Sequence, residues 1–240
     1  EELGTVTVLP PAETWWRYFG EESEVWSSSY YGSAGSFVVN LPCPYTVNGV
    51  VYSQIRVCVD GLIYLLSPEN PQWGFIEQIS IPPQLSATLL SSKHIAIAGF
   101  CADLYVRAKT WGSKVCYGST DISSGRASVI EFCDFGFASD VISGAMNLFT
   151  FQLILPSDEP NVFYLTYMPI PSSYYASNNP TMGDQCPMLN PRTQNEAYYN
   201  LTLSPSDSFF SSMRTVRFFI GCGTDPKKAD TDGDGFSDGE

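Results

Sequence analysis

The feature that most restricts the fold of this chain is the alternation of residue types along short runs. In residues 51–60 (VYSQIRVCVD), Val, Ser, Ile, Val and Val occupy the odd positions, whereas Tyr, Gln, Arg, Cys and Asp occupy the even ones. A period of two residues is typical of a β-strand with one buried face. The dipeptide Asp60-Gly61 then predicts a hairpin turn into residues 62–66, an apolar run short enough to be a core strand.

Six further runs have strand character, and turn residues separate them. We predict strands at residues 94–100, 104–108, 127–135, 148–155, 162–168 and 214–220. Residues 84–92 offer the one short helical candidate, and Pro, Gly, Asn and Ser recur in the connections. Because parallel sheets would need crossover helices, the sequence predicts an all-β fold, an antiparallel β-sandwich or jelly roll.

The β-prone start of the chain is set apart from this body. Residues 3–9 (LGTVTVL) are followed at once by Pro10-Pro11, which predicts an N-terminal β arm within residues 1–12, ahead of a β-sandwich domain at 13–222. Two arrangements of the arm stay open: strand addition to a neighbouring copy, which would build filaments, or pairing in its own sheet as an ordinary first strand. The apolar residues available for assembly are Leu3, Val6, Val8 and Leu9.

The acidic balance of the chain restricts its partners. With 12 Lys plus Arg against 25 Asp plus Glu the net charge is −13, so no basic face is available for nucleic acid or anionic lipid, and cations are the expected ligands. No long apolar run suits direct membrane insertion. Because the chain begins with Glu1, we expect that a targeting peptide has been removed and that the protein is extracellular or on the cell surface.

Seven cysteines favour the same compartment. They are scattered without a Cys-x-x-Cys pair, and His94 is the single histidine, which leaves few partners for zinc. Disulfides in an oxidising compartment are the better interpretation, although the connectivity stays open and the odd count leaves one thiol over. The disulfide candidates are Cys43, Cys58, Cys101, Cys116, Cys133, Cys186 and Cys222. Asn200, in the tripeptide NLT, is a glycosylation acceptor for a glycoprotein.

The C-terminal run 224–240 (TDPKKADTDGDGFSDGE) carries the clearest chemistry. Carboxylates recur at every second position and again four residues later, with Gly between them. Calcium takes roughly six to eight oxygen ligands, and a D-x-D-x-D-G turn wraps three carboxylates around one centre. We therefore predict a Ca²⁺ loop over residues 223–240. Its expected ligands are Asp230, Asp232, Asp234, the Phe236 carbonyl and Asp238, with Glu240 and Asp225 as weaker candidates.

This run resembles the thrombospondin type 3 calcium repeat, in the form TDPxxxDTDGDGxSDGE, at nearly every defining position. An EF-hand is the weaker alternative, because no helix-forming sequence precedes the loop. In the resembled family such repeats come in tandem and act as stiff, calcium-filled linkers. The resemblance therefore implies structural calcium and further repeats after Glu240 in the precursor.

The body of the chain resembles nidogen-type extracellular β domains. The segments similar to successive strands of that group, and to its TIGxQ segment, are residues 36–42, 50–52, 55–64, 129–132, 149–155 and 181–185. The chain departs from the group in its Asp-Gly turn, where Asn-Gly is usual, in its added cysteines, and in residues 15–35 and 67–92. The resemblance implies a role in extracellular structure and adhesion, with no catalytic residues to carry over.

Catalysis is the least supported class of function. His94 lies in a strand-like run, and no G-x-S-x-G elbow accompanies it, which argues against a Ser-His-Asp hydrolase. A glycosidase needs two facing carboxylates. Glu131 and Asp134 differ by three positions, which places them on opposite faces of a regular strand, although a pair across strands that includes Asp60 or Asp103 stays open.

Aromatic pairs keep a second binding class open. They are Trp15-Trp16, Tyr30-Tyr31, Tyr174-Tyr175 and Tyr198-Tyr199, and such rings can stack on sugars or form ordinary core and interface contacts. The function we predict is an extracellular structural subunit of a filament, surface layer or adhesin, not an enzyme, with structural Ca²⁺ and self-association into a homopolymer. The alternatives are a secreted carbohydrate-binding module that takes glycans and, well behind, a secreted hydrolase.

Overall fold

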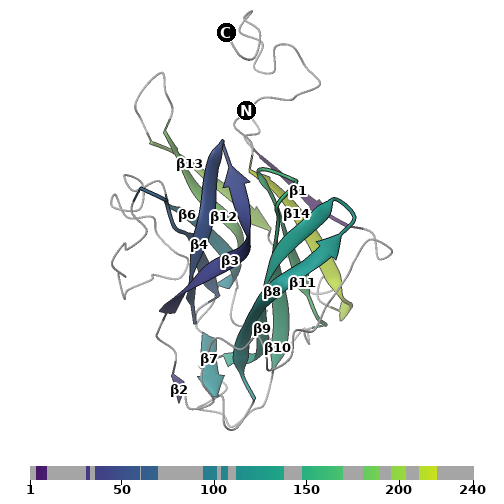
Figure 1. Ribbon diagram of the computed structural model, residues 1–240. Helices are drawn as coiled ribbons and strands as arrows, with labels where there is room; N and C mark the ends of the chain where they lie inside the picture. Colours follow the sequence, from purple (N-terminus) through teal and green to yellow (C-terminus); the bar gives the residue numbers. More distant parts are fainter. Residues whose placement is uncertain are drawn as a thin grey trace, which may run out of the picture.

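The computed structural model shows antiparallel β-strands arranged in two sheets (Figure 1). It describes residues 4–9, 31–32, 36–59, 61–69, 94–101, 104–107, 112–137, 148–169, 181–189, 196–203 and 211–220. Within these ranges no helix is long and apolar enough to cross a membrane. The predicted all-β sandwich class is confirmed.

The larger sheet is built around one long strand. Its strands are β1 (Gly4–Val8), β2 (Tyr31–Gly32), β7 (Leu104–Arg107), β8 (Lys114–Ile122), β9 (Gly125–Phe137), β10 (Phe149–Pro156), β11 (Val162–Tyr167) and β14 (Arg214–Ile220). Their order is β1-β14-β11-β10-β9-β7-β2. The central strand β9 pairs with β10 along one edge and with β8 and then β7 along the other.

The smaller sheet has the order β13-β12-β6-β5-β4-β3. Its strands are β3 (Ser36–Val47), β4 (Val50–Cys58), β5 (Leu62–Leu65), β6 (Ile95–Cys101), β12 (Thr181–Leu189) and β13 (Glu196–Leu203). Asn48 and Gly49 join β3 to β4 in a two-residue turn, and both have positive φ, 50° and 76°. This pair of conformations is the one that a tight hairpin turn with the twist of its strands requires.

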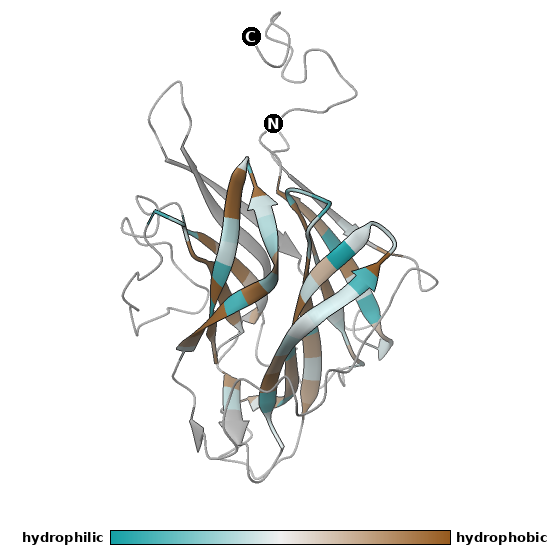
Figure 2. Ribbon diagram, viewed as in Figure 1, coloured by the Kyte–Doolittle hydropathy of each residue, from teal (hydrophilic) through white to brown (hydrophobic). Residues whose placement is uncertain are grey.

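The core between the sheets is rich in aromatic rings. Phe132 on β9 stacks on Phe151 on β10 with ring centroids 4.4 Å apart, and Phe100 of the smaller sheet lies 4.6 Å from Phe149. All four rings are buried. Hydrophobic residues recur along the strands of both sheets in Figure 2, so each sheet supplies one wall of a shared apolar layer, as in other sandwiches.

The predicted strands coincide closely with the observed ones. The expected hairpin at Asp60-Gly61 joins β4 to β5, with Gly61 at a φ of 74°, while Asp60 and the helical candidate 84–92 lie outside the described residues. Strands β2, β8 and β13 were not among the predictions, and parts of β3 and β12 were quoted only for the nidogen-type resemblance. In β8 the polar run Tyr-Gly-Ser-Thr-Asp at 117–121 hides the alternation.

The N-terminal arm is strand β1, and it pairs with β14 of the same chain. The ladder runs antiparallel from Gly4 opposite Ile220 to Val8 opposite Val216, and the Leu9 amide continues it by donating to the Thr215 carbonyl at 2.9 Å. Of the two arrangements left open by the sequence, the structure has the pairing within its own sheet. β1 is the end strand of the larger sheet and also contacts β13, the end strand of the smaller one.

Candidate functional site

The predicted calcium ligands cannot be placed, because residues 221–240 lie outside the described part of the chain. Within the described part, no group of three or more His, Cys, Asp or Glu side chains could hold a metal ion. Of the aromatic pairs, no side chain is described either. Of the candidate catalytic residues, the structure places His94, Glu131 and Asp134, whereas Asp60 and Asp103 lie outside the described residues.

His94 precedes β6 and is fully buried. Its Nδ1 accepts a hydrogen bond from the Ser67 backbone N–H at 2.8 Å, which requires that nitrogen to carry no proton. The pKa of His94 is lowered from 6.5 to about 4, chiefly by burial; a hydrogen bond with the Leu65 backbone opposes this effect, and the charge of Arg56 adds a smaller lowering. The imidazole is therefore neutral near pH 7 and ties β6 to the segment after β5.

Glu131 on β9 is a buried carboxyl held by two side-chain donors. The Cys133 thiol donates to Oε1 at 2.8 Å, and Gln152 Nε2 on β10 donates to Oε2. Burial raises the pKa of Glu131, while the two hydrogen bonds and the Lys114 charge act in the opposite direction. Asp134 adds a further raising effect. The carboxyl is fully enclosed, so it has no contact with solvent.

Glu131 belongs to a row of polar residues that crosses five strands. Successive ladders place Cys116 opposite Glu131, Glu131 opposite Gln152, Gln152 opposite Thr166, and Thr166 opposite Thr215. All five are fully buried. The hydroxyls of Thr166 and Thr215 lie 2.9 Å apart. We call these five residues the transverse polar row, and it lies on the face of the larger sheet that points away from Phe132 and Phe151.

A β-bulge corrects one geometric prediction. Phe132 lies opposite Phe151 while Phe135 lies opposite Phe149, so β9 has one residue more than β10 over this stretch. Asp134 within the bulge has a φ of 53°, and Phe132 and Phe135 both enter the core. Regular alternation therefore does not hold here, and it was wrong to use it to place Glu131 and Asp134 on opposite faces. Their burial still separates them, because Glu131 is buried and Asp134 exposed.

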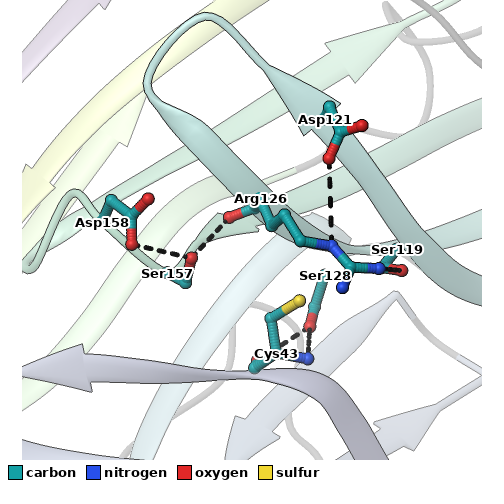
Figure 3. Close-up of polar contacts among 7 residues, drawn as sticks. All are labelled: Cys43, Ser119, Asp121, Arg126, Ser128, Ser157 and Asp158. Carbon is teal, nitrogen blue, oxygen red and sulfur yellow. Dashed lines mark hydrogen bonds and ion pairs between the residues drawn. The ribbon is translucent and has the colours of Figure 1, made fainter.

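A buried polar contact joins the two sheets. Around residues 41–44 (LPCP) the register of β3 against β4 shifts, because two prolines flank Cys43 and lack the N–H group of a ladder. The Ser128 hydroxyl on β9 accepts from the Cys43 N–H at 2.9 Å and donates to the Cys43 carbonyl at 2.8 Å, as Figure 3 shows. One serine thus satisfies both backbone groups of the displaced residue.

The surface beside this contact carries an exposed ion pair. At the β8–β9 hairpin Arg126 lies 3.8 Å from Asp121 and donates to Ser119 (Figure 3). Both charged side chains are largely exposed, at 66% and 89%. An ion pair of this kind contributes little to stability and forms no enclosed site.

The cysteines and the glycosylation candidate have the following places. Cys43, Cys58, Cys116 and Cys133 are buried, and no disulfide joins any two of these four. The side chains of Cys101, Cys186 and Cys222 are not among those described. Asn200 lies on β13 opposite Gln185. Sequence reasoning missed the roles of Gln152, Thr166, Thr215 and Ser128, because these roles depend on the register between strands.

Comparison with known proteins finds no matching family model, no matching curated protein and no matching solved structure.

Proposed function

We propose that this protein is an extracellular structural subunit, a component of a filament, surface layer or adhesin, that uses calcium structurally at its C-terminal loop. The observation that carries the proposal is how the candidate acid–base residues are buried and hydrogen-bonded. His94 and Glu131 are fully buried and serve as hydrogen-bond partners between neighbouring segments. Groups used in this way connect neighbouring segments of the sandwich, and a connected, rigid sandwich suits a load-bearing or adhesive unit.

The calcium part of the proposal rests on the sequence of the terminal loop. The spacing of Asp230, Asp232 and Asp234 followed by Gly235 suits a hard cation with oxygen ligands. With a net charge of −13 the chain gains from binding a divalent cation, because neutralising clustered carboxylates relieves their mutual repulsion. Structural calcium, extracellular location and self-association are thus one connected proposal.

The position of β1 supports assembly by strand exchange. β1 is an edge strand of the larger sheet, and the strand with which it pairs is β14. If β1 of a neighbouring copy took this place, the same five residue pairs would form again, so exchange between copies would leave the ladder unchanged.

Electron microscopy of the purified protein, with and without a calcium chelator, tests the proposal. We expect ordered filaments or sheets that loosen on chelation. Asp232→Asn should weaken them, whereas the matched control Asp121→Asn, which removes the same charge from an exposed side chain on β8, should not. Dispersed particles in all conditions would contradict the assembly.

A pair of arm variants separates strand exchange from other modes of assembly. Thr7 has an exposed side chain and lies opposite Arg217, and the alternation of the ladder from the Leu9 bond directs the Thr7 N–H toward β14. Thr7→Pro removes that donor, whereas Thr7→Ala keeps it. Filaments that survive Thr7→Pro would exclude the arm as the joining element. Glycan-array binding by dispersed particles would instead favour the carbohydrate-binding alternative.

A further inference from the structure

The thiols of Cys116 and Cys133 lie together on the same face of two neighbouring strands. Cys116 on β8 is opposite Glu131, and Cys133 on β9 is two residues beyond Glu131, so the two cysteines are diagonal neighbours across one antiparallel ladder. Both are buried. Cys116 is also the largest cause of the raised pKa of the Cys133 thiol, in agreement with the diagonal placement of the two side chains.

We propose that Cys116 and Cys133 form a cross-strand disulfide that links β8 to β9 when the chain folds in an oxidising compartment. The other two cysteines whose side chains are described do not compete for either thiol. Cys43 belongs to β3 and Cys58 to β4, both in the smaller sheet. Cys58 lies in a separate cluster with Leu62 and Tyr64.

The local backbone favours this diagonal. Diagonal residues in a regular antiparallel ladder lie about 7–8 Å apart at Cα, slightly more than the roughly 4.4–6.8 Å of a disulfide. The β-bulge beside Cys133, marked by the positive φ of Asp134, increases the local twist of β9. Stronger twist shortens one diagonal of each pair, and we take the Cys116–Cys133 diagonal as the short one, in keeping with the effect of Cys116 on the Cys133 pKa.

The reaction needs an oxidant, which we take to be a low-molecular-weight disulfide such as glutathione disulfide. One cysteine thiolate attacks that disulfide and releases one glutathione thiolate, and the second cysteine then displaces the other glutathione from the mixed disulfide. Two protein thiols are oxidised to one disulfide, one glutathione disulfide is reduced to two thiols, and the two protons leave to solvent or to the released thiolates.

The order of events follows from the surroundings of Cys133. The hydrogen bond with Cys116, burial and the Glu131 carboxyl all raise the pKa of the Cys133 thiol, so the attacking thiolate is scarce once the sheet has closed. The disulfide therefore forms during folding, before β8 and β9 bury the pair. For the same reason the finished disulfide is shielded from reductants in the native protein.

Refolding of the full chain in a glutathione redox buffer, followed by alkylation under denaturing conditions, tests the pairing. Digestion with trypsin and chymotrypsin places Cys133 and Cys186 on different peptides, and mass spectrometry should find the Cys116 peptide linked to the Cys133 peptide. This measurement needs no variant. Recovery of both cysteines alkylated, or of either linked to another cysteine, would overturn the proposal.

Counting thiols in serine variants gives an independent readout. Relative to the oxidised wild type, Cys116→Ser and Cys133→Ser should each release one additional thiol, and the double variant should return to the wild-type count. A double variant that gains two thiols or loses two would contradict the pair. Cys43→Ser is the control for removing a buried cysteine elsewhere and should leave the linked peptide intact. Because the buffer supplies the oxidant, the result is independent of the proposed extracellular role.

Discussion

Asn161 and Asn48 hold the two sheets together at one end of the sandwich: Asn161 Oδ1 accepts a hydrogen bond from the Asn48 backbone N–H at 2.6 Å. Asn48 belongs to the β3–β4 turn, and Asn161 precedes β11 in the other sheet. The Asn161 N–H donates to the Thr46 carbonyl at 2.9 Å, and its carbonyl accepts from the Ile220 N–H at 2.7 Å. One residue therefore connects the hairpin turn, β11 and β14.

Replacing Asn161 should reveal two separate contributions to stability. Asn161 has a φ of 65°, a conformation that Asn and Gly adopt far more readily than Ala. Asn161→Ala loses the side-chain acceptor and strains the backbone, so we expect the free energy of unfolding to fall by about 2–3 kcal/mol. Asn161→Gly keeps the conformation and should lose about 1 kcal/mol.

Urea denaturation with an unchanged m value measures both differences. The informative quantity is the gap between the alanine and glycine variants, which isolates the backbone strain from the lost hydrogen bond. Equal losses for the two variants would mean that the positive φ of Asn161 is not maintained in solution.

Ser128→Ala should be one of the more costly single-atom deletions in the core. It leaves the Cys43 N–H and carbonyl buried without the hydroxyl that satisfies both, and the flanking prolines prevent β3 from regaining a regular ladder there. We expect a loss of about 2–4 kcal/mol, since each orphaned buried group costs about 1–3 kcal/mol. Thermal or urea unfolding measures it.

Ser157→Ala is the matched control. The Ser157 hydroxyl also donates to a backbone carbonyl, that of Arg126, at 2.8 Å (Figure 3). The contact is exposed, and the Ser157 N–H donates to the same carbonyl, so no buried group is orphaned. A change within about 0.5 kcal/mol is expected. If both serine variants behaved alike, the Cys43 contact would have no special role.

Alternation of residue types was sufficient to predict most of the strands but not their connections across the sandwich. Residues 51–58 and 149–155 lie in strands β4 and β10 as predicted, but the faces predicted for β4 do not hold throughout, because Val51 is exposed and Tyr52 is buried with Ile55. The β3–β4 hairpin was overlooked even though Asn48-Gly49 is a strong turn signal. Pro42 and Pro44 make β3 hard to predict as one continuous strand, because prolines usually interrupt a strand. The hydrogen bond that compensates for them comes from Ser128, which is 85 residues away in the sequence.

The neighbourhood of Glu131 shows why a site is harder to predict than a strand. Its pairing with Gln152 depends on the register between β9 and β10, and that register shifts at a bulge whose positive-φ residue is Asp134. No local pattern in the sequence marks this extra residue. The calcium loop is the opposite case, since its chemistry can be read from spacing alone, and it stays a prediction.

His94 should make the protein lose stability as the pH falls. Its folded-state pKa of about 4 lies below the ordinary 6.5, so the native state resists a proton that the unfolded chain accepts. The contribution of His94 to the free energy of unfolding is fully present above pH 6.5 and is lost as the pH falls toward 4. The total loss should be up to about 3 kcal/mol. His94→Asn, whose Oδ1 can still accept from the Ser67 N–H, should lack this loss in urea unfolding across that range.

Glu131 should act in the opposite direction, which makes the replacement Glu131→Gln stabilising at neutral pH. A raised folded-state pKa means that the native state binds the proton more tightly than the unfolded chain, so the contribution is present below pH 4.5 and is lost as the pH rises through the folded-state pKa. The neutral amide removes the cost of a buried charge, and its single oxygen still accepts from one of the two donors, Cys133 or Gln152. The stability difference between Glu131→Gln and wild type should therefore grow as the pH rises above 4.5, as measured by urea unfolding at a series of pH values.

His94 and Glu131 lie in different sheets and share no hydrogen-bond partner among those described, so their effects should add in the double variant His94→Asn, Glu131→Gln. A Gln variant that is less stable than wild type at neutral pH would show that the ionised carboxylate is favourable where it lies, and that its two donors outweigh its burial.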